Sequence, residues 1–203
     1  MRVAIIGQKW LAAELLKRCL AEGHQVVIAI APALGADGEY DRLYAAAQQM
    51  GVPADCTQGR LSADQVPACD VILTAHAHVY IKEEVRAKAT HGALGYHPSL
   101  LPRHRGRDAV HWAIHMREPI TGGSVYWLDD GADTGPVLVQ DWCHIRSDDT
   151  AQLLWRRELA PMGLRLFSRA LAMLDAGDDC KGCPQDHDLA TWEPGVSNRR
   201  LSG

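Results

Sequence analysis

His97 and the aspartates of residues 129–133 are the side chains of this sequence that are best placed for chemistry. His97 follows the apolar run 94–96 and enters a loop that prolines stiffen. Open α/β sheets keep their ligands at the carboxyl ends of their strands, which is where such a histidine would lie. If the carboxylate of Asp133 reaches the same crevice, the pair is the minimal equipment for general acid–base work on a carbonyl group.

The same two residues also have a plainer interpretation. A buried, charge-assisted hydrogen bond between His97 and Asp133 would tie two loops together without any chemistry. Both interpretations require that the imidazole and the carboxylate meet, so the residues taken alone leave the catalytic and the structural role open.

The first half of the chain alternates apolar, β-branched runs with stretches of helical spacing. This alternation predicts an α/β fold: a doubly wound, mostly parallel sheet with helices on both faces. Gly7 follows the first run, but the second and third glycines of the dinucleotide fingerprint are absent, so we expect Gly7 only to permit a tight turn. The predicted strands are 2–6, 25–31 and 70–74, and the predicted helices are 11–20 and 40–50.

The second half changes in texture after residue 95. A loop rich in proline, arginine and histidine precedes a helix near 108–116, two alternating runs that resemble a hairpin, and a long helix that opens at Thr150 and that Pro161 could kink. We predict a catalytic domain over residues 1–177 and a surface tail over residues 178–203. The predicted hairpin strands are 123–128 and 137–145.

Composition places the chain among ordinary globular proteins. It has 203 residues, of which 47% are apolar and 23% charged, and its formal net charge is −4. No overall positive field exists to hold nucleic acid or an anionic membrane, and no apolar run approaches about 18 residues. We therefore expect a cytoplasmic protein that binds neither nucleic acid nor a membrane and keeps its six cysteines reduced.

Two clusters could in principle hold zinc. His111 and His115 lie one helical turn apart, but Trp112 stands where the metalloprotease pattern needs glutamate. Cys180 and Cys183 with His187 supply three ligands, but no second cysteine pair completes the site. A metal-dependent hydrolase stays open as an alternative, and we expect no metal.

Two motifs carry a resemblance that covers nearly the whole chain. His97–Pro102 with the Arg105-Gly106 pair, and later 129–136 with its Asp-Asp-Gly-x-Asp-Thr-Gly-Pro pattern, resemble the signature of the folate-dependent formyltransferase superfamily. Within it the chain is most similar to the hydrolase domain of 10-formyltetrahydrofolate dehydrogenase. The supporting segments are 2–8, 96–106, 184–185 and 190–191.

The resemblance implies a Rossmann-like formyltransferase domain whose carrier substrate is 10-formyltetrahydrofolate, which is converted to tetrahydrofolate. It also implies that His97 and Asp133 are the catalytic residues and that the Leu101-Pro102 peptide bond is cis. Implied folate-binding residues are Leu73, Thr74, Ala75, His76, Ala77, His78, Tyr80, Asp129, Asp130 and Gly131, and implied substrate-binding residues are Gly95, Ser99, Arg103 and Arg105.

Gly95 departs from the pattern of the superfamily's amine transferases, which carry asparagine there. A missing oxyanion donor typically costs about a hundredfold to a thousandfold in rate. We therefore expect the formyl group to pass to water. A small amine or amino-sugar acceptor, and a folate binder without activity, are the alternatives; the oligomeric state is left open.

Overall fold

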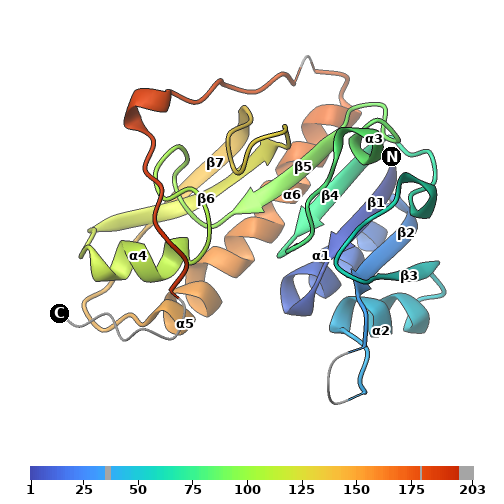
Figure 1. Ribbon diagram of the computed structural model, residues 1–203, viewed down its shortest axis with the longest axis horizontal. Helices are drawn as coiled ribbons and strands as arrows, with labels where there is room; N and C mark the ends of the chain where they lie inside the picture. The colour runs from blue at the N-terminus through green and yellow to red at the C-terminus, as the bar shows by residue number, and fades with distance from the viewer. Residues whose placement is uncertain (35–37, 179, 197–203) are drawn as a thin grey trace. The chain divides into compact units, whose positions relative to one another are not determined.

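The computed structural model describes residues 1–34, 38–178 and 180–196. The chain divides into two compact units, Met1–Gly95 and Tyr96–Gly203, and each is described by itself (Figure 1). The predicted catalytic domain over residues 1–177 covers the first unit and most of the second. In the described part of the chain, no helix combines the length and the apolar character that crossing a bilayer requires.

A parallel sheet forms the centre of the first unit. Its strands follow the order β3-β2-β1-β4-β5, and every neighbouring pair is parallel. Its middle strands are continuous apolar runs because both of their faces are buried, as Ile5, Ile30 and Ile72 show. The strands are β1 (Arg2–Gly7), β2 (Gln25–Pro32), β3 (Ala54–Thr57), β4 (Val71–Ala75) and β5 (Ala93–His97).

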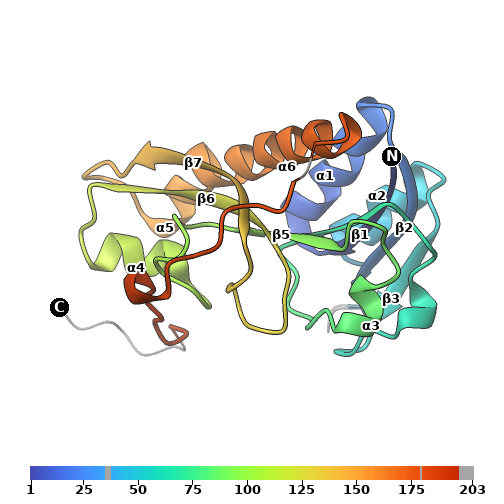
Figure 2. The same cartoon turned by 90° about the horizontal axis from the view of Figure 1, so that it is seen from above.

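Helices cover both faces of this sheet. Helices α1 (Lys9–Ala21) and α2 (Arg42–Gln49) lie on one face, and the short α3 (Glu83–Arg86) lies on the other (Figure 2). The apolar side of α1 is buried, as its helical spacing predicts. The prediction of a doubly wound α/β sheet is confirmed.

Gly7 allows the ends of β1 and β4 to approach closely. A Cβ atom at Gly7 would lie 2.0 Å from the carbonyl oxygen of Ala75, which also accepts the Gln8 backbone N–H at 3.2 Å. Glycine is therefore required by the contact between two strand ends, which is a stricter demand than the tight turn that the sequence suggests.

The second unit is built on an antiparallel strand pair, β6 (Ile120–Trp127) and β7 (Val137–His144), which confirms the predicted hairpin. Helix α4 (Ala109–His115) precedes it. The remaining helices are α5 (Ala151–Leu154), the π-helical turn Trp155–Leu159 and α6 (Ala160–Asp175). Short 3₁₀ helices lie at Ala63–Gln65 in the first unit and His187–Leu189 in the second.

The predicted irregularity near Pro161 takes the form of that π-helical turn. Proline has no N–H to donate to the carbonyl four residues earlier, so the regular ladder cannot continue through it. The Tyr96 hydroxyl donates to the carbonyl oxygen of Leu159 at 2.6 Å, at the junction of the π turn and α6. Burial holds the pKa of Tyr96 far above its ordinary value, so this phenol stays a donor.

The segment after α6 differs from the predicted surface tail. Gln185 and Glu193 are only 8% and 7% exposed, so the expectation is wrong for these two side chains. The polar composition misleads because buried polar groups are common where each of them finds a partner. Residues 179 and 197–203 of the predicted tail lie outside the described part.

Candidate active site

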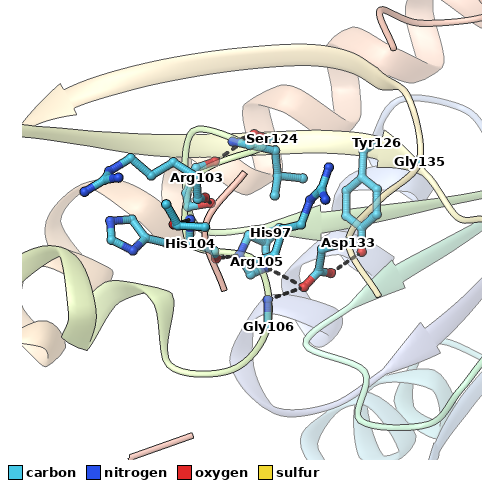
Figure 3. Close-up of polar contacts among 12 residues, drawn as sticks. His97, Arg103, His104, Arg105, Gly106, Ser124, Tyr126, Asp133 and Gly135 are labelled. Atoms are coloured by element: carbon cyan, nitrogen blue, oxygen red, sulfur yellow. Dashed lines mark hydrogen bonds and ion pairs between the residues drawn. The ribbon is translucent and has the colours of Figure 1, made fainter. Parts of the chain in front are cut away.

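His97 is held at the end of β5 with one ring nitrogen committed to the backbone. Its Nε2 atom lies 2.6 Å from the carbonyl oxygen of His104, and the residue is 7% exposed (Figure 3). A carbonyl oxygen only accepts, so Nε2 must carry the hydrogen. Nδ1 then faces Asp133, whose Oδ2 atom is 3.6 Å away. The two predicted catalytic residues therefore meet, and Nδ1 is the nitrogen left for chemistry.

Both carboxylate oxygens of Asp133 accept hydrogen bonds from donors that keep their own hydrogen. The Gly106 backbone N–H donates to Oδ2 at 2.7 Å, and the Tyr126 hydroxyl donates to Oδ1 at 2.6 Å (Figure 3). Burial, followed by the negative charge of Asp133, raises the pKa of Tyr126 well above its ordinary value, so the phenol keeps its proton. Two such donors stabilise the charged carboxylate.

The loop that carries Asp133 is folded by Asp129. The Oδ1 atom of Asp129 accepts the Gly131 backbone N–H at 3.0 Å and the Thr134 hydroxyl at 2.7 Å. A Cβ atom at Gly135 would lie 1.8 Å from the carbonyl oxygen of Trp127, so only glycine fits there. Asp130 and Gly131 are exposed. The predicted contact of Asp129, Asp130 and Gly131 with folate stays a prediction.

The loop after His97 is braced by buried hydroxyl groups. Ser99 is fully buried, and its hydroxyl donates to the carbonyl oxygen of Arg103 at 2.6 Å. The Ser124 hydroxyl on β6 donates to the Ser99 carbonyl at 2.7 Å and accepts the Leu101 N–H at 3.1 Å. The Leu101-Pro102 peptide bond is cis, as the resemblance implies. Ser99 thus has a structural role, and its contact with substrate stays a prediction.

Arg103 and Arg105, the two arginines expected to bind substrate, differ in their surroundings. Arg103 has an exposed side chain and donates from Nε to Glu118 at 2.6 Å. Arg105 is buried, and its guanidinium donates to the Gln185 side-chain oxygen at 2.7 and 3.1 Å. Arg105 therefore serves the fold of the second unit, and the binding of substrate by either arginine stays a prediction.

Gln185 belongs to the site although only the resemblance of residues 184–185 pointed to that segment. Its side-chain amide donates to the carbonyl oxygens of Asp133 at 2.9 Å and Gly135 at 2.7 Å. The oxygen of the same amide accepts a hydrogen bond from Arg105, which lies in the loop after His97. The segment after α6 therefore connects the loop of Asp133 to the loop of His97.

The predicted folate-binding stretch 73–80 lies in the first unit, together with Gly95 on β5. Leu73, Thr74 and Ala75 are buried within β4, and the Thr74 hydroxyl donates to the Leu94 carbonyl at 3.2 Å. After the strand, the rings of His76 and His78 lie 5.3 Å apart, Ala77 lines a cavity of about 260 Å³, and Tyr80 is 54% exposed. Folate binding by this stretch and substrate binding by Gly95 stay predictions.

His76 should make the first unit sensitive to acid. Burial, then the charges of Lys9 and His78, lowers its pKa from 6.5 to about 4. The unfolded chain therefore binds a proton between pH 6.5 and 4 that the folded chain excludes, so stability is complete above pH 6.5 and is lost as the pH falls. Urea unfolding at pH 7.5 and 5.0 should show a smaller acid loss of stability in His76→Asn, because the asparagine side chain does not titrate in this range. Asparagine also tolerates the left-handed backbone at this position (φ 55°).

The matched control for this prediction is His91→Asn, at an exposed histidine of the same unit. It should keep the acid sensitivity of the parent chain. Equal acid losses in His76→Asn and the parent would contradict the assignment.

The two histidine and cysteine clusters that could in principle hold zinc are not assembled into a site in the described residues. Within those residues, no three histidine, cysteine, aspartate or glutamate side chains gather where they could hold a metal ion. His111 and His115 lie on α4, and His187 Nδ1 accepts a hydrogen bond from the Arg105 guanidinium at 3.3 Å.

Comparisons with known proteins agree on one family. Residues 1–171 match the family described as Formyl transferase. Mouse (Mus musculus) mitochondrial 10-formyltetrahydrofolate dehydrogenase is 34% identical over 203 residues, which cover 95% of this chain and 22% of the relative. The chain thus spans about a fifth of the length of the dehydrogenases that it matches.

Solved structures share the fold at lower identity. Glycinamide ribonucleotide transformylase 1 from Symbiobacterium toebii superposes with a TM-score of 0.74 at 19% identity, over 92% of this chain and 94% of that one. An N-formyltransferase from Helicobacter canadensis, in complex with folinic acid and dTDP-3-aminofucose, gives a TM-score of 0.75 at 17% identity, over 94% and 70% of the two chains. The Rossmann-like formyltransferase fold is thereby confirmed.

Proposed function

This chain belongs to the formyl transferase family, and from that premise we propose that it cleaves the formyl group of 10-formyltetrahydrofolate and passes it to water. The observation that carries the proposal is the meeting of His97 Nδ1 and Asp133 Oδ2 at 3.6 Å, with the remaining polar atoms of both side chains already engaged. A contact that only stabilises the two loops would not require separate hydrogen bonds that fix the orientation of both side chains.

The mechanism follows from the atoms left available. Water attacks the formyl carbon, the new carbon–oxygen bond forms, and the Asp133 carboxylate takes up the released proton and passes it to Nδ1 of His97, 3.6 Å away. Protonated His97 faces the site through Nδ1–H and stabilises the negative charge on the former carbonyl oxygen. Collapse of the tetrahedral intermediate breaks the bond to N10, which takes up the proton that the His97–Asp133 pair removed from water. The products are formate and tetrahydrofolate.

Gly95 supports water as the acceptor. The resemblance places asparagine at this position in members that transfer to amines, and glycine offers no side-chain donor. The Helicobacter canadensis structure, which holds an amino sugar beside folinic acid, supports the second candidate, transfer to a small amine.

One experiment separates these functions. The protein is mixed with 10-formyltetrahydrofolate, with and without candidate amines, while tetrahydrofolate, free formate and formylated amine are measured. Equal amounts of formate and tetrahydrofolate without any amine support the hydrolase. Amine-dependent turnover with a formylated product supports the transferase, and tight folate binding without turnover would leave only a binding protein.

Tyr126→Phe should weaken this activity without abolishing it. The change removes the hydroxyl that donates to Asp133 Oδ1 and leaves the ring in place. A hydrogen bond to a charged group is worth about 1.5–3 kcal/mol, so kcat/KM for formate release should fall roughly tenfold to a hundredfold. Steady-state kinetics measures this effect. Tyr40→Phe, at an exposed tyrosine outside the predicted site, is the control and should keep the parent rate. An unchanged rate in Tyr126→Phe would contradict the role of its hydroxyl.

A further inference from the structure

His104 is a buried titratable residue that the proposed mechanism does not use. It is 2% exposed, and its ring lies between two carboxylates of the second unit. Nε2 is 3.1 Å from Glu118 Oε1, and Nδ1 is 3.0 Å from Glu193 Oε1. Glu118 precedes β6 and Glu193 lies after α6, so segments far apart in the sequence converge on this one imidazole.

The surroundings of His104 fit a ring that carries hydrogen on both nitrogens. A neutral imidazole has one nitrogen without hydrogen, and on either side of this ring that nitrogen would lie within 3.1 Å of a carboxylate oxygen. Neither ring nitrogen makes an aligned hydrogen bond within the described residues, so the two short nitrogen–carboxylate contacts are those of an ion pair if the ring carries both hydrogens. Arg103 adds a second cation, which donates to Glu118. Burial raises the pKa of Glu118, but the contacts with Arg103 and His104 outweigh it and lower that pKa overall.

The backbone of His104 adopts a conformation that its surroundings must hold. Its φ angle is +57°, in the left-handed region that residues other than glycine rarely adopt. Its N–H donates to the Thr191 hydroxyl at 2.8 Å, so the segment after α6 restrains the backbone as well as the ring. In this conformation the His104 carbonyl points at His97 Nε2, 2.6 Å away.

We propose that His104, held as an imidazolium between Glu118 and Glu193, is a positioning residue that fixes the tautomer of His97 through its own backbone carbonyl. The ion-paired ring anchors the left-handed backbone, the carbonyl requires hydrogen on Nε2, and Nδ1 is thereby reserved for the side facing Asp133. The effect on catalysis rests on the proposed function, whereas the effect on the tautomer does not.

The first test reads the tautomer directly. In the parent chain labelled with ¹⁵N-histidine, NMR at neutral pH should show the neutral form of His97 as the Nε2–H tautomer, with the signal assigned by its loss in His97→Gln. In Glu193→Gln and His104→Gln, we expect a mixture of both tautomers. Thermal unfolding and circular dichroism establish that each variant is folded, and Glu193→Gln keeps the test usable if His104→Gln is not.

The second test uses turnover of 10-formyltetrahydrofolate. Loss of orientation should lower kcat about tenfold to a hundredfold and leave KM within about threefold, because the reacting groups are displaced while folate contacts persist. His115→Gln, at an exposed histidine of α4, and Glu84→Gln, at an exposed glutamate of α3, are the matched controls and should behave like the parent.

The outcomes separate the two proposals. A single Nε2–H tautomer of His97 in folded His104→Gln and Glu193→Gln would overturn the role of His104, whatever the activity. A changed tautomer with an unchanged kcat would overturn its effect on catalysis. A parent chain without turnover would overturn the proposed function, while the NMR result would still decide the role of His104.

Discussion

His97→Ala should remain folded and release formate from 10-formyltetrahydrofolate at least about a thousandfold more slowly than the parent chain, the upper range of general acid–base catalysis combined with oxyanion stabilisation. The variant loses the nitrogen that faces Asp133 and also the group that would neutralise the tetrahedral intermediate. Single-turnover measurements of tetrahydrofolate formation would isolate the chemical step from product release.

His111→Ala is the control for this variant, because it removes an exposed imidazole from α4 and touches neither catalytic loop. It should keep the parent rate. If His97→Ala also retained near-normal deformylation, the assignment of His97 as the catalytic histidine would have to be abandoned.

Asp133→Asn should lower the same rate by about a thousandfold to ten-thousandfold, comparable with replacing the carboxylate that orients histidine in a serine protease triad. An amide cannot take up the proton of the attacking water. Its NH₂ group would also oppose one of the two donors, Gly106 N–H or the Tyr126 hydroxyl, that now meet carboxylate oxygens. Stopped-flow kinetics with purified folded variant measures the loss.

Asp148→Asn, at an exposed aspartate of the same unit, should leave the rate unchanged. The double variant His97→Ala with Asp133→Asn should be scarcely slower than either single variant, because the two residues act as one catalytic unit. If the fold-loss in rate of the double variant equalled the product of the two single-variant losses, the two side chains would act independently.

Much of the fold could be predicted because its signals are local. Continuous apolar runs identify the buried strands β1, β2 and β4, and helical spacing identifies α1. The sequence motifs also indicated that His97 and Asp133 meet, since each follows or separates β-runs that end at one edge of a sheet. Predicting that these two residues meet requires only the types of the secondary-structure elements and their order along the chain.

Other features were missed because they depend on distant partners. Strand β3 (Ala54–Thr57) is a short edge strand with a mixed pattern, and α3 has a single turn, so neither has a periodicity that identifies it. Gln185 and Glu193 resemble solvated residues until their distant partners are placed beside them: Arg105 donates to the Gln185 amide oxygen, and the His104 ring faces the Glu193 carboxylate. Likewise, nothing near His104 in the sequence indicates a left-handed backbone.

The fastening of both catalytic loops by residues beyond α6 bears on where this protein can be shortened. The family match ends at residue 171, and Gln185 and Glu193 come after it. A truncation placed at that limit would retain every strand, His97, Asp133 and all of α6 except its last turn, yet remove the amide that holds the Asp133 carbonyl and the carboxylate that faces His104. Such a fragment would contain both reactive side chains but lack the contacts that hold them in position.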